Sequence, residues 1–262
     1  MERIVQRVHI NTHIEKTAGT SLQEFFTRFY GPQNAYIYSS DTDTLVRANR
    51  LIMKARTNTL VDRIRYVSKQ LGLTALAHSI VINHLSNHSE NHHLNQLPKN
   101  CLFIHGHFVA DYFDKFGIKQ FRTIILRDPL ERTISHYKYW KEARGVTNHR
   151  VQIPFDERMD FRDFALLGQM CNFQTTAFGG LKIYDFDLVG VTQNIELFTD
   201  KFLSKSPRKG RLSKDDVKRL NVSPKLHNFS QLGIDDEFLK KFRLENDLDY
   251  SNYQIAMEMN GI

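Results

Sequence analysis

A loop at residues 16–21 brings one cation, three hydroxyl groups and a glycine together. Its residues are Lys16, Thr17, Ala18, Gly19, Thr20 and Ser21. Lysine, hydroxyl groups and the backbone N–H groups at the start of a helix are the groups with which proteins bind phosphate. The loop therefore predicts a phosphate site, although a helix start capped by the hydroxyl of Thr20 or Ser21 would explain the same residues.

The order of these residues differs from that of the Walker A loop, which binds the phosphates of ATP. In that motif the lysine directly follows the second glycine, whereas Lys16 comes before Gly19. A lysine in this position would lie beside the phosphate chain, near a bridging oxygen. The order argues against an ATPase or a kinase.

Arg127 and Ser135 form a second candidate anion site. Arg127 follows the apolar run at residues 121–126, and Pro129 suits the first turn of a helix that carries Ser135 two turns later. The planar guanidinium of arginine suits a terminal phosphate. In the alternative interpretation, Arg127 pairs with Asp128 and Ser135 is a surface hydroxyl.

The third candidate is the pair of histidines His105 and His107, which follow the apolar run at residues 101–104. A neutral imidazole can act as a general base near neutral pH. Two histidines could also bind zinc, but we expect these side chains to point to opposite faces of a strand, which argues against a shared ion. A buried structural histidine is the remaining alternative.

Each of these groups follows an apolar run that predicts a buried strand, at residues 8–14, 101–104 and 121–126. An apolar stripe at helical spacing follows the first loop and comprises Leu22, Phe25, Phe26 and Phe29. Open α/β sheets bind ligands at the carboxyl ends of their strands, so we expect the three groups to meet there. The sequence predicts a three-layer α/β fold with a mainly parallel central sheet flanked by helices.

We expect a single domain over residues 1–262, with a helical and histidine-rich insertion at about 31–100. Apolar residues at helical spacing between Leu45 and Leu73 predict one or two amphipathic helices there. His84, His88 and His92 recur every fourth residue, and we favour a surface loop over a metal site because Asn and Ser are poor helix formers. Residues from 235 onward predict two packing helices.

The loop at 16–21 and the segment Arg127-Asp128-Pro129, with Arg132 and Ser135, together resemble the sulfotransferases that use 3′-phosphoadenosine 5′-phosphosulfate (PAPS). The resemblance implies a fold similar to that of P-loop kinases. It also implies that residues 16–21 bind the 5′-phosphosulfate and that Arg127 and Ser135 bind the 3′-phosphate.

The histidine pair, with the residues around it, resembles the heparan sulfate and uronyl 2-O-sulfotransferase branch of that family. This implies that His107 is the catalytic base and that His105 is a supporting partner. The implied reaction moves a sulfuryl group to a hydroxyl, on a saccharide, while Lys16 stabilises the leaving phosphate oxygen. No metal is implied.

The resemblance covers residues 8–30 and 101–141 well and residues 186–228 loosely. Asn221 to Lys225 resembles the loop that closes over the nucleotide, which implies that Lys225 contacts the cofactor. Two positions depart from the family pattern. Glu15 stands where many relatives have proline, so its carboxylate must be held away from the sulfate, and Gln193 stands where glutamate is usual.

The composition is compatible with an anionic donor and acceptor. The chain has 262 residues, a formal net charge of +7 and a pI near 9.3. Its basic residues are dispersed, with no recognised nucleic-acid-binding motif, and no stretch reaches about 18 apolar residues. We expect a cytoplasmic enzyme without a membrane span or a nucleic-acid partner, its oligomeric state left open. The rival hypotheses are a kinase-like enzyme that uses Mg-ATP and a non-catalytic polyanion-binding module.

Overall fold

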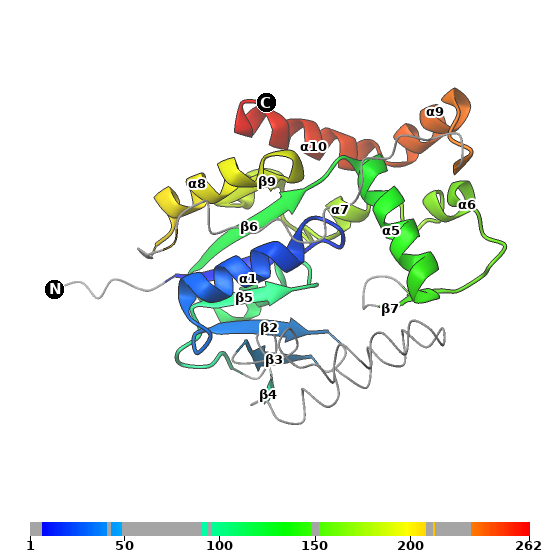
Figure 1. The fold of residues 1–262 in the computed structure, drawn as a ribbon. Helices are drawn as coiled ribbons and strands as arrows, with labels where there is room; N and C mark the ends of the chain where they lie inside the picture. Colours follow the sequence, from blue (N-terminus) through cyan, green and yellow to red (C-terminus); the bar gives the residue numbers. More distant parts are fainter. Residues whose placement is uncertain are drawn as a thin grey trace.

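A seven-stranded sheet runs through the centre of the molecule (Figure 1). The computed structural model describes residues 7–40, 43–48, 91–93, 96–147, 152–207, 212 and 232–262. In spatial order the strands are β4 (Asn91–His93), β3 (Thr44–Arg47), β2 (Ala35–Ser39), β5 (Phe103–Gly106), β1 (Val8–Thr12), β6 (Gln120–Leu126) and β9 (Leu188–Val191). Strands β2, β5, β1, β6 and β9 are parallel to one another. Strand β3 runs antiparallel to β2, and β4 runs antiparallel to β3.

One face of the sheet is covered by α1 (Gly19–Tyr30) and α8 (Ile195–Lys205). The apolar stripe that predicts the first helix is the buried side of α1, because Leu22, Phe25, Phe26 and Phe29 all belong to the core there. Full burial of one such side chain stabilises a fold by about 1.5–3 kcal/mol. Two phenylalanines of α8, Phe198 and Phe202, fill the same layer.

The opposite face is covered by helices that follow β5 in the chain. They are η1 (Tyr112–Phe116), α5 (Pro129–Ala143), α6 (Phe161–Ala165), α7 (Phe173–Thr176) and α10 (Asp247–Asn260). Trp140 of α5 is fully buried in this layer, and its indole Nε1 donates to the carbonyl of Ile153 at 3.1 Å. This bond ties α5 to a small hairpin of β7 (Gly145–Thr147) and β8 (Gln152–Pro154).

Helices on both faces of a mixed, mostly parallel sheet confirm the predicted α/β fold class. The two C-terminal helices predicted from residue 235 onward are also confirmed, as α9 (Asp236–Glu245) and α10. The last strand of the sheet, β9, is joined to α8 by η3 (Thr192–Asn194). A short 3₁₀ helix, η2 (Ile183–Asp185), precedes β9.

The prediction of a helical insertion at about 31–100 is wrong for its first part. Residues 35–39 and 44–47 form β2 and β3, and residues 91–93 form β4, all in the same sheet as the rest of the chain. Leu45, taken as the start of the predicted helices, is a buried strand residue. The prediction failed there because a short apolar run fits a strand as well as it fits a helix. The predicted helices over residues 51–73, and His84 and His88, lie outside the described residues.

Candidate functional site

The three groups of candidate residues meet at the carboxyl ends of three adjacent strands, β5, β1 and β6 (Figure 1). His107 comes directly after β5, Lys16 lies in the loop after β1, and Arg127 directly follows β6. Two bonds connect the groups. Arg127 Nη1 donates to the carbonyl of Lys16 at 3.4 Å, and His107 Nδ1 lies 3.0 Å from the carbonyl of His13 in the same loop.

The loop between β1 and α1 has an unusual backbone. Lys16 has φ 71° and Ala18 has φ 64°, and both values lie in the left-handed region that side chains other than glycine rarely adopt. Such a residue costs on the order of 1–3 kcal/mol, a strain that is typical of ligand-binding loops. Left-handed residues in a short loop also turn successive N–H groups toward one side, where they can bind an anion.

Helix α1 begins without a side-chain cap. Its N-cap residue is Ala18, so the alternative in which Thr20 or Ser21 caps the helix is wrong. Within the described part of the chain, no acceptor is found for the backbone N–H groups of Gly19 and Thr20. Because the first N–H groups of a helix need an external acceptor, this end of α1 can bind an anion.

The three hydroxyls of the loop differ in their access to a ligand. Thr17 is buried, and its hydroxyl donates to the carbonyl of Ile14 at 2.8 Å, so its proton holds the turn together. Ser21 is buried, whereas Thr20 is exposed. Thr20 can therefore contact a bound phosphate with less rearrangement of the loop than Thr17 or Ser21.

Lys16 places its ammonium group against α5. The Nζ atom lies 4.7 Å from the centre of the Tyr139 ring, within the range of a cation–π contact. Burial lowers the pKa of Lys16, an effect that Glu142 opposes and Arg127 reinforces. A bound anion would favour the charged form of this side chain.

The backbone of Arg127 is held by the side chain of Gln174. The amide of Gln174 accepts from the Arg127 N–H at 2.9 Å and donates to the Arg127 carbonyl at 2.8 Å. The guanidinium Nε contacts exposed Glu131 at 3.3 Å. The alternative ion pair with Asp128 is wrong, because Asp128 caps α5 by accepting from the N–H of Glu131 at 2.9 Å.

Gln174 is itself positioned by the C-terminal helix. The buried carboxylate of Asp249 in α10 accepts from the N–H groups of Gln174 and Thr175 at 3.0 and 2.7 Å, and from the Thr175 hydroxyl at 2.8 Å. Asp249 lies in one of the two predicted packing helices, and neither it nor Gln174 was among the predicted site residues. Only the fold brings these two residues, far apart in the sequence, next to Arg127.

Ser135 lies in the interior of α5. With 7% of its surface exposed it is not a surface hydroxyl, so that alternative is wrong. Its neighbour in the predicted motif, Arg132, is fully buried, bonds to His136 at 3.1 Å and stacks on the Phe173 ring at 4.2 Å. Arg132 therefore packs α5 against α7 inside the protein.

The two predicted histidines share a neighbour, His13. The ring of His13 lies 5.0 Å from that of His105 and 4.3 Å from that of His107. The expectation that His105 and His107 point to opposite faces is wrong, because residues two apart in an extended chain share a face. Among the described residues, no group of three or more His, Cys, Asp or Glu side chains could bind a metal ion.

His13 also explains the glycine at the start of α1. A Cβ atom at Gly19 would lie 1.8 Å from Nε2 of His13, so only glycine leaves room for the ring. His13 was not among the predicted site residues. Its signal in the sequence was its alternation with His9 and Asn11, which places all three on one face of β1 and its extension.

A buried hydrogen-bond chain runs beneath the histidines. His105 Nδ1 bonds to the side-chain oxygen of Asn11 at 2.7 Å, and Asn11 Nδ2 donates to the Thr123 hydroxyl at 2.7 Å. His9 Nε2 bonds to the same hydroxyl at 2.8 Å. The strand register places Asn11 beside both His105 and Thr123, so the chain crosses three strands.

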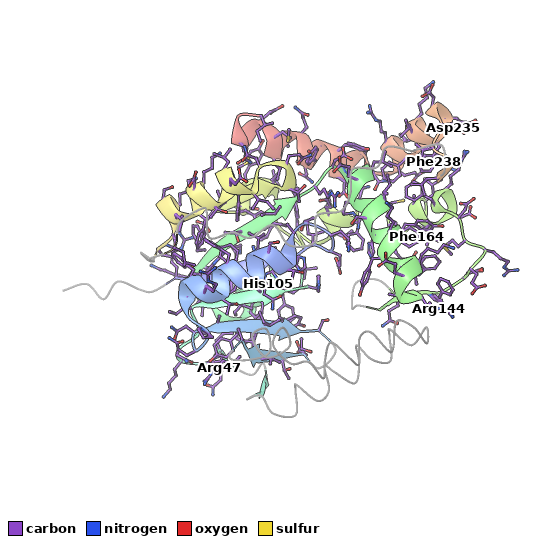
Figure 2. The ribbon with its side chains drawn as sticks, in the orientation of Figure 1. Arg47, His105, Arg144, Phe164, Asp235 and Phe238 are labelled. Atoms are coloured by element: carbon purple, nitrogen blue, oxygen red, sulfur yellow. The ribbon has the colours of Figure 1, made fainter. Side chains whose placement is uncertain are left out.

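Burial keeps the inner histidines neutral. It lowers the pKa of His105 to about 3, with a smaller contribution from His107, and it also lowers the pKa of His9. His105 is 2% exposed and lies in the interior of the molecule (Figure 2), so it cannot itself contact a bound acceptor. Its predicted role as a supporting partner stays a prediction.

His107 is accessible, with 33% of its side chain exposed, whereas His105 is buried. Its Nδ1 faces two oxygens, the carbonyl of His13 at 3.0 Å and the carboxylate of Glu15 at 3.4 Å. Two acceptors on one side favour a proton on Nδ1. The other nitrogen, Nε2, is then the atom that can take a proton from a ligand.

The remaining predicted contacts lie elsewhere. Lys225, predicted to contact the nucleotide, lies outside the described residues. Gln193 follows β9 and bonds to the hydroxyl of Tyr253 in α10. Burial and then the charge of Asp128 raise the pKa of Tyr253 to about 12. Arg127 also acts on this hydroxyl, so Gln193 and Tyr253 lie on the Arg127 side of the site.

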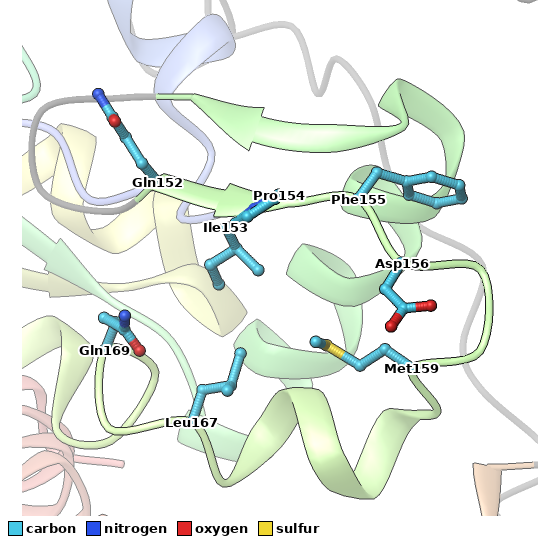
Figure 3. Close-up of a pocket in the computed structure, with 8 residues that line it drawn as sticks. All are labelled: Gln152, Ile153, Pro154, Phe155, Asp156, Met159, Leu167 and Gln169. Carbon is cyan, nitrogen blue, oxygen red and sulfur yellow. The ribbon is translucent and has the colours of Figure 1, made fainter.

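A cavity of about 370 Å³ lies apart from these residues (Figure 3). Its lining comprises Gln152, Ile153, Pro154, Phe155, Asp156, Met159, Leu167 and Gln169. Ile153, Met159 and Leu167 point into it from β8, from the loop that follows and from the end of α6. None of the predicted site residues lines this cavity.

Comparison with known proteins gives no further guide. No model of a known protein family matches the sequence, and no curated protein is similar to it. Within the described residues, no helix has the length and apolar character needed to cross a membrane.

Proposed function

We propose that this protein transfers a sulfuryl group from PAPS to a hydroxyl group of a saccharide. The observation that carries the proposal is that a half-buried lysine, an accessible histidine and an arginine lie together at three adjacent strand ends. The resemblance of the two anion-binding segments and of the histidine pair to PAPS-dependent sulfotransferases supplies the reaction and the saccharide.

The donor would lie across the loop after β1 and the start of α5. The N–H groups of Gly19 and Thr20, the Thr20 hydroxyl and Lys16 would bind the 5′-phosphosulfate. Arg127 would bind the 3′-phosphate after its guanidinium leaves Glu131. Ser135 and Lys225 are assigned to the nucleotide by the resemblance alone.

Transfer needs one bond to form and one to break. The acceptor oxygen attacks sulfur in line, the bond between sulfur and the bridging phosphate oxygen breaks, and the acceptor proton moves to Nε2 of His107. Lys16 stabilises the charge that grows on the leaving oxygen. As in phosphoryl transfer, the protein contributes positioning and charge stabilisation.

Calorimetric titration with 3′-phosphoadenosine 5′-phosphate (PAP) tests the proposal without knowledge of the acceptor. We expect micromolar or tighter binding of PAP and much weaker binding of adenosine 5′-phosphate and of ATP with magnesium. Preference for Mg-ATP would favour a kinase-like enzyme instead. Binding of none of the three nucleotides would favour a polyanion-binding module.

A further inference from the structure

Glu15 lies in the loop between β1 and α1, and its negative charge opposes an anionic ligand there. Its carboxylate does not point into bulk water, because 10% of the side chain is exposed and Oε1 lies 3.4 Å from Nδ1 of His107. We propose that Glu15 is a positioning residue that fixes the tautomer of His107 and stabilises its protonated ring. This inference rests on the proposed function, in which His107 is the base.

The backbone of the loop separates Glu15 from its neighbour Lys16. Lys16 adopts the left-handed conformation, with φ 71°. The carboxylate of Glu15 is directed to His107 after β5, whereas the ammonium of Lys16 lies over Tyr139 of α5. Two consecutive residues of opposite charge therefore serve different parts of the site, and the carboxylate is turned toward the base.

The groups around His107 define which nitrogen carries the proton. Nδ1 faces the carbonyl of His13 and the carboxylate of Glu15, and both are acceptors. The other titratable neighbours are the imidazoles of His13 and His105, and burial favours the neutral form of His105. A proton on Nδ1 can be donated to the His13 carbonyl while it faces the Glu15 carboxylate, and it leaves Nε2 free to accept the acceptor's proton.

The carboxylate acquires its full effect during the reaction. When Nε2 takes the acceptor proton, the ring becomes positively charged, and Glu15 at 3.4 Å compensates that charge. The role corresponds in chemistry to the aspartate that orients the histidine in Ser-His-Asp triads. The carbonyl of His13 alone can fix the tautomer but supplies no net charge.

The test compares wild-type protein with Glu15→Gln and Glu15→Asp, with Glu237→Gln on α9 as an exposed control. Imidazole ¹⁵N NMR of the full chain, assigned with a His107→Gln variant, reports the tautomer of His107. We expect a protonated Nδ1 in the wild-type protein. In Glu15→Gln we expect a larger share of the Nε2-protonated tautomer, because the amide can donate to Nδ1.

Kinetics and nucleotide binding separate positioning from folding. We expect Glu15→Gln to lower kcat at least tenfold with the KM for PAPS and the affinity for PAP unchanged, Glu15→Asp to recover part of kcat, and Glu237→Gln to match the wild-type protein. Unchanged ¹⁵N shifts in Glu15→Gln, or a kcat within twofold of the wild-type value, would overturn the proposal. The NMR measurement needs no turnover, so an absence of sulfuryl transfer would overturn the proposed function while the spectrum still decides the role of Glu15.

Discussion

The two sides of the candidate site are built differently. On the histidine side, formed by β1 and β5, the ring of His13 stacks on that of His105 and contacts that of His107 above a buried chain of neutral hydrogen bonds. On the cation side, formed by β6 and α5, the backbone of Arg127 is fixed while its guanidinium contacts exposed Glu131. Fixed rings suit a proton transfer, whereas an adjustable cation suits the binding of a charged ligand.

This difference follows from the cost of burying charge. A neutral imidazole with its partners in place can be buried cheaply, but an unpaired buried cation costs far more. The cation side therefore anchors the Arg127 main chain to Gln174 and pairs its guanidinium with exposed Glu131. The comparison predicts that changes on the histidine side affect turnover and stability, and that changes on the cation side affect ligand affinity.

Replacement of the base should give the largest effect. His107→Ala removes the proton acceptor, and general-base catalysis contributes about 10²–10⁴-fold. We expect kcat to fall by this factor while PAP binds with unchanged affinity, measured by steady-state kinetics and calorimetry. A His107→Ala variant that keeps more than half of the wild-type kcat would remove His107 from the mechanism.

Lys16→Ala should come next and should affect both measurements. Removal of one group that stabilises the developing charge typically costs about 10²–10³-fold in turnover. We expect a loss of this size together with weaker binding of the donor, because in the proposed mechanism Lys16 would contact the transferred group before and during the reaction. The contrast with His107 would break down if Lys16→Ala left turnover unchanged.

Arg127→Ala should affect binding selectively. A hydrogen bond to a charged group contributes about 1.5–3 kcal/mol, equivalent to roughly 10- to 150-fold in affinity. We expect PAP to bind more weakly by this factor while adenosine 5′-phosphate, which lacks the 3′-phosphate, binds as it does to the wild-type protein. Equal losses for both nucleotides in calorimetry would show that Arg127 does not read the 3′-phosphate.

Acid should destabilise the histidine side. The pKa of His105 is about 3 in the folded protein and about 6.5 in an unfolded chain, so the unfolded state takes up protons first as the pH falls. Stability is therefore greatest above pH 6.5 and declines toward pH 3, by about 2 kcal/mol between pH 7 and pH 5 for this one group. Urea unfolding at the two pH values measures the loss, and His105→Asn should reduce it.

Three strands of the sheet were predictable because each carries several apolar residues within a short run. That pattern gave β1, β5 and β6, and with them the positions of Lys16, His107 and Arg127 at one end of the sheet. The strands at residues 35–39 and 44–47 were missed because short apolar runs carry no decisive period.

The supporting residues of the site were harder to predict. Gln174 and Asp249 act on Arg127 only through contacts between distant parts of the chain. His13 lies in the segment predicted as a strand at residues 8–14, and its contact with Gly19 depends on the left-handed turn between them. Sequence spacing indicates which residues can do chemistry, but it does not indicate which neighbours hold them.

The contact between Gln174 and Asp249 also orders the assembly of the site during synthesis. All members of the buried chain beneath the histidines lie between residues 9 and 123, so this part has its complete set of partners once β6 has left the ribosome. On the cation side, Asp249 can position Gln174 only after α10 has been synthesised. A nascent chain that ends before α10 would have the hydrogen-bond partners of these histidines in place while Gln174 still lacks its contact with Asp249.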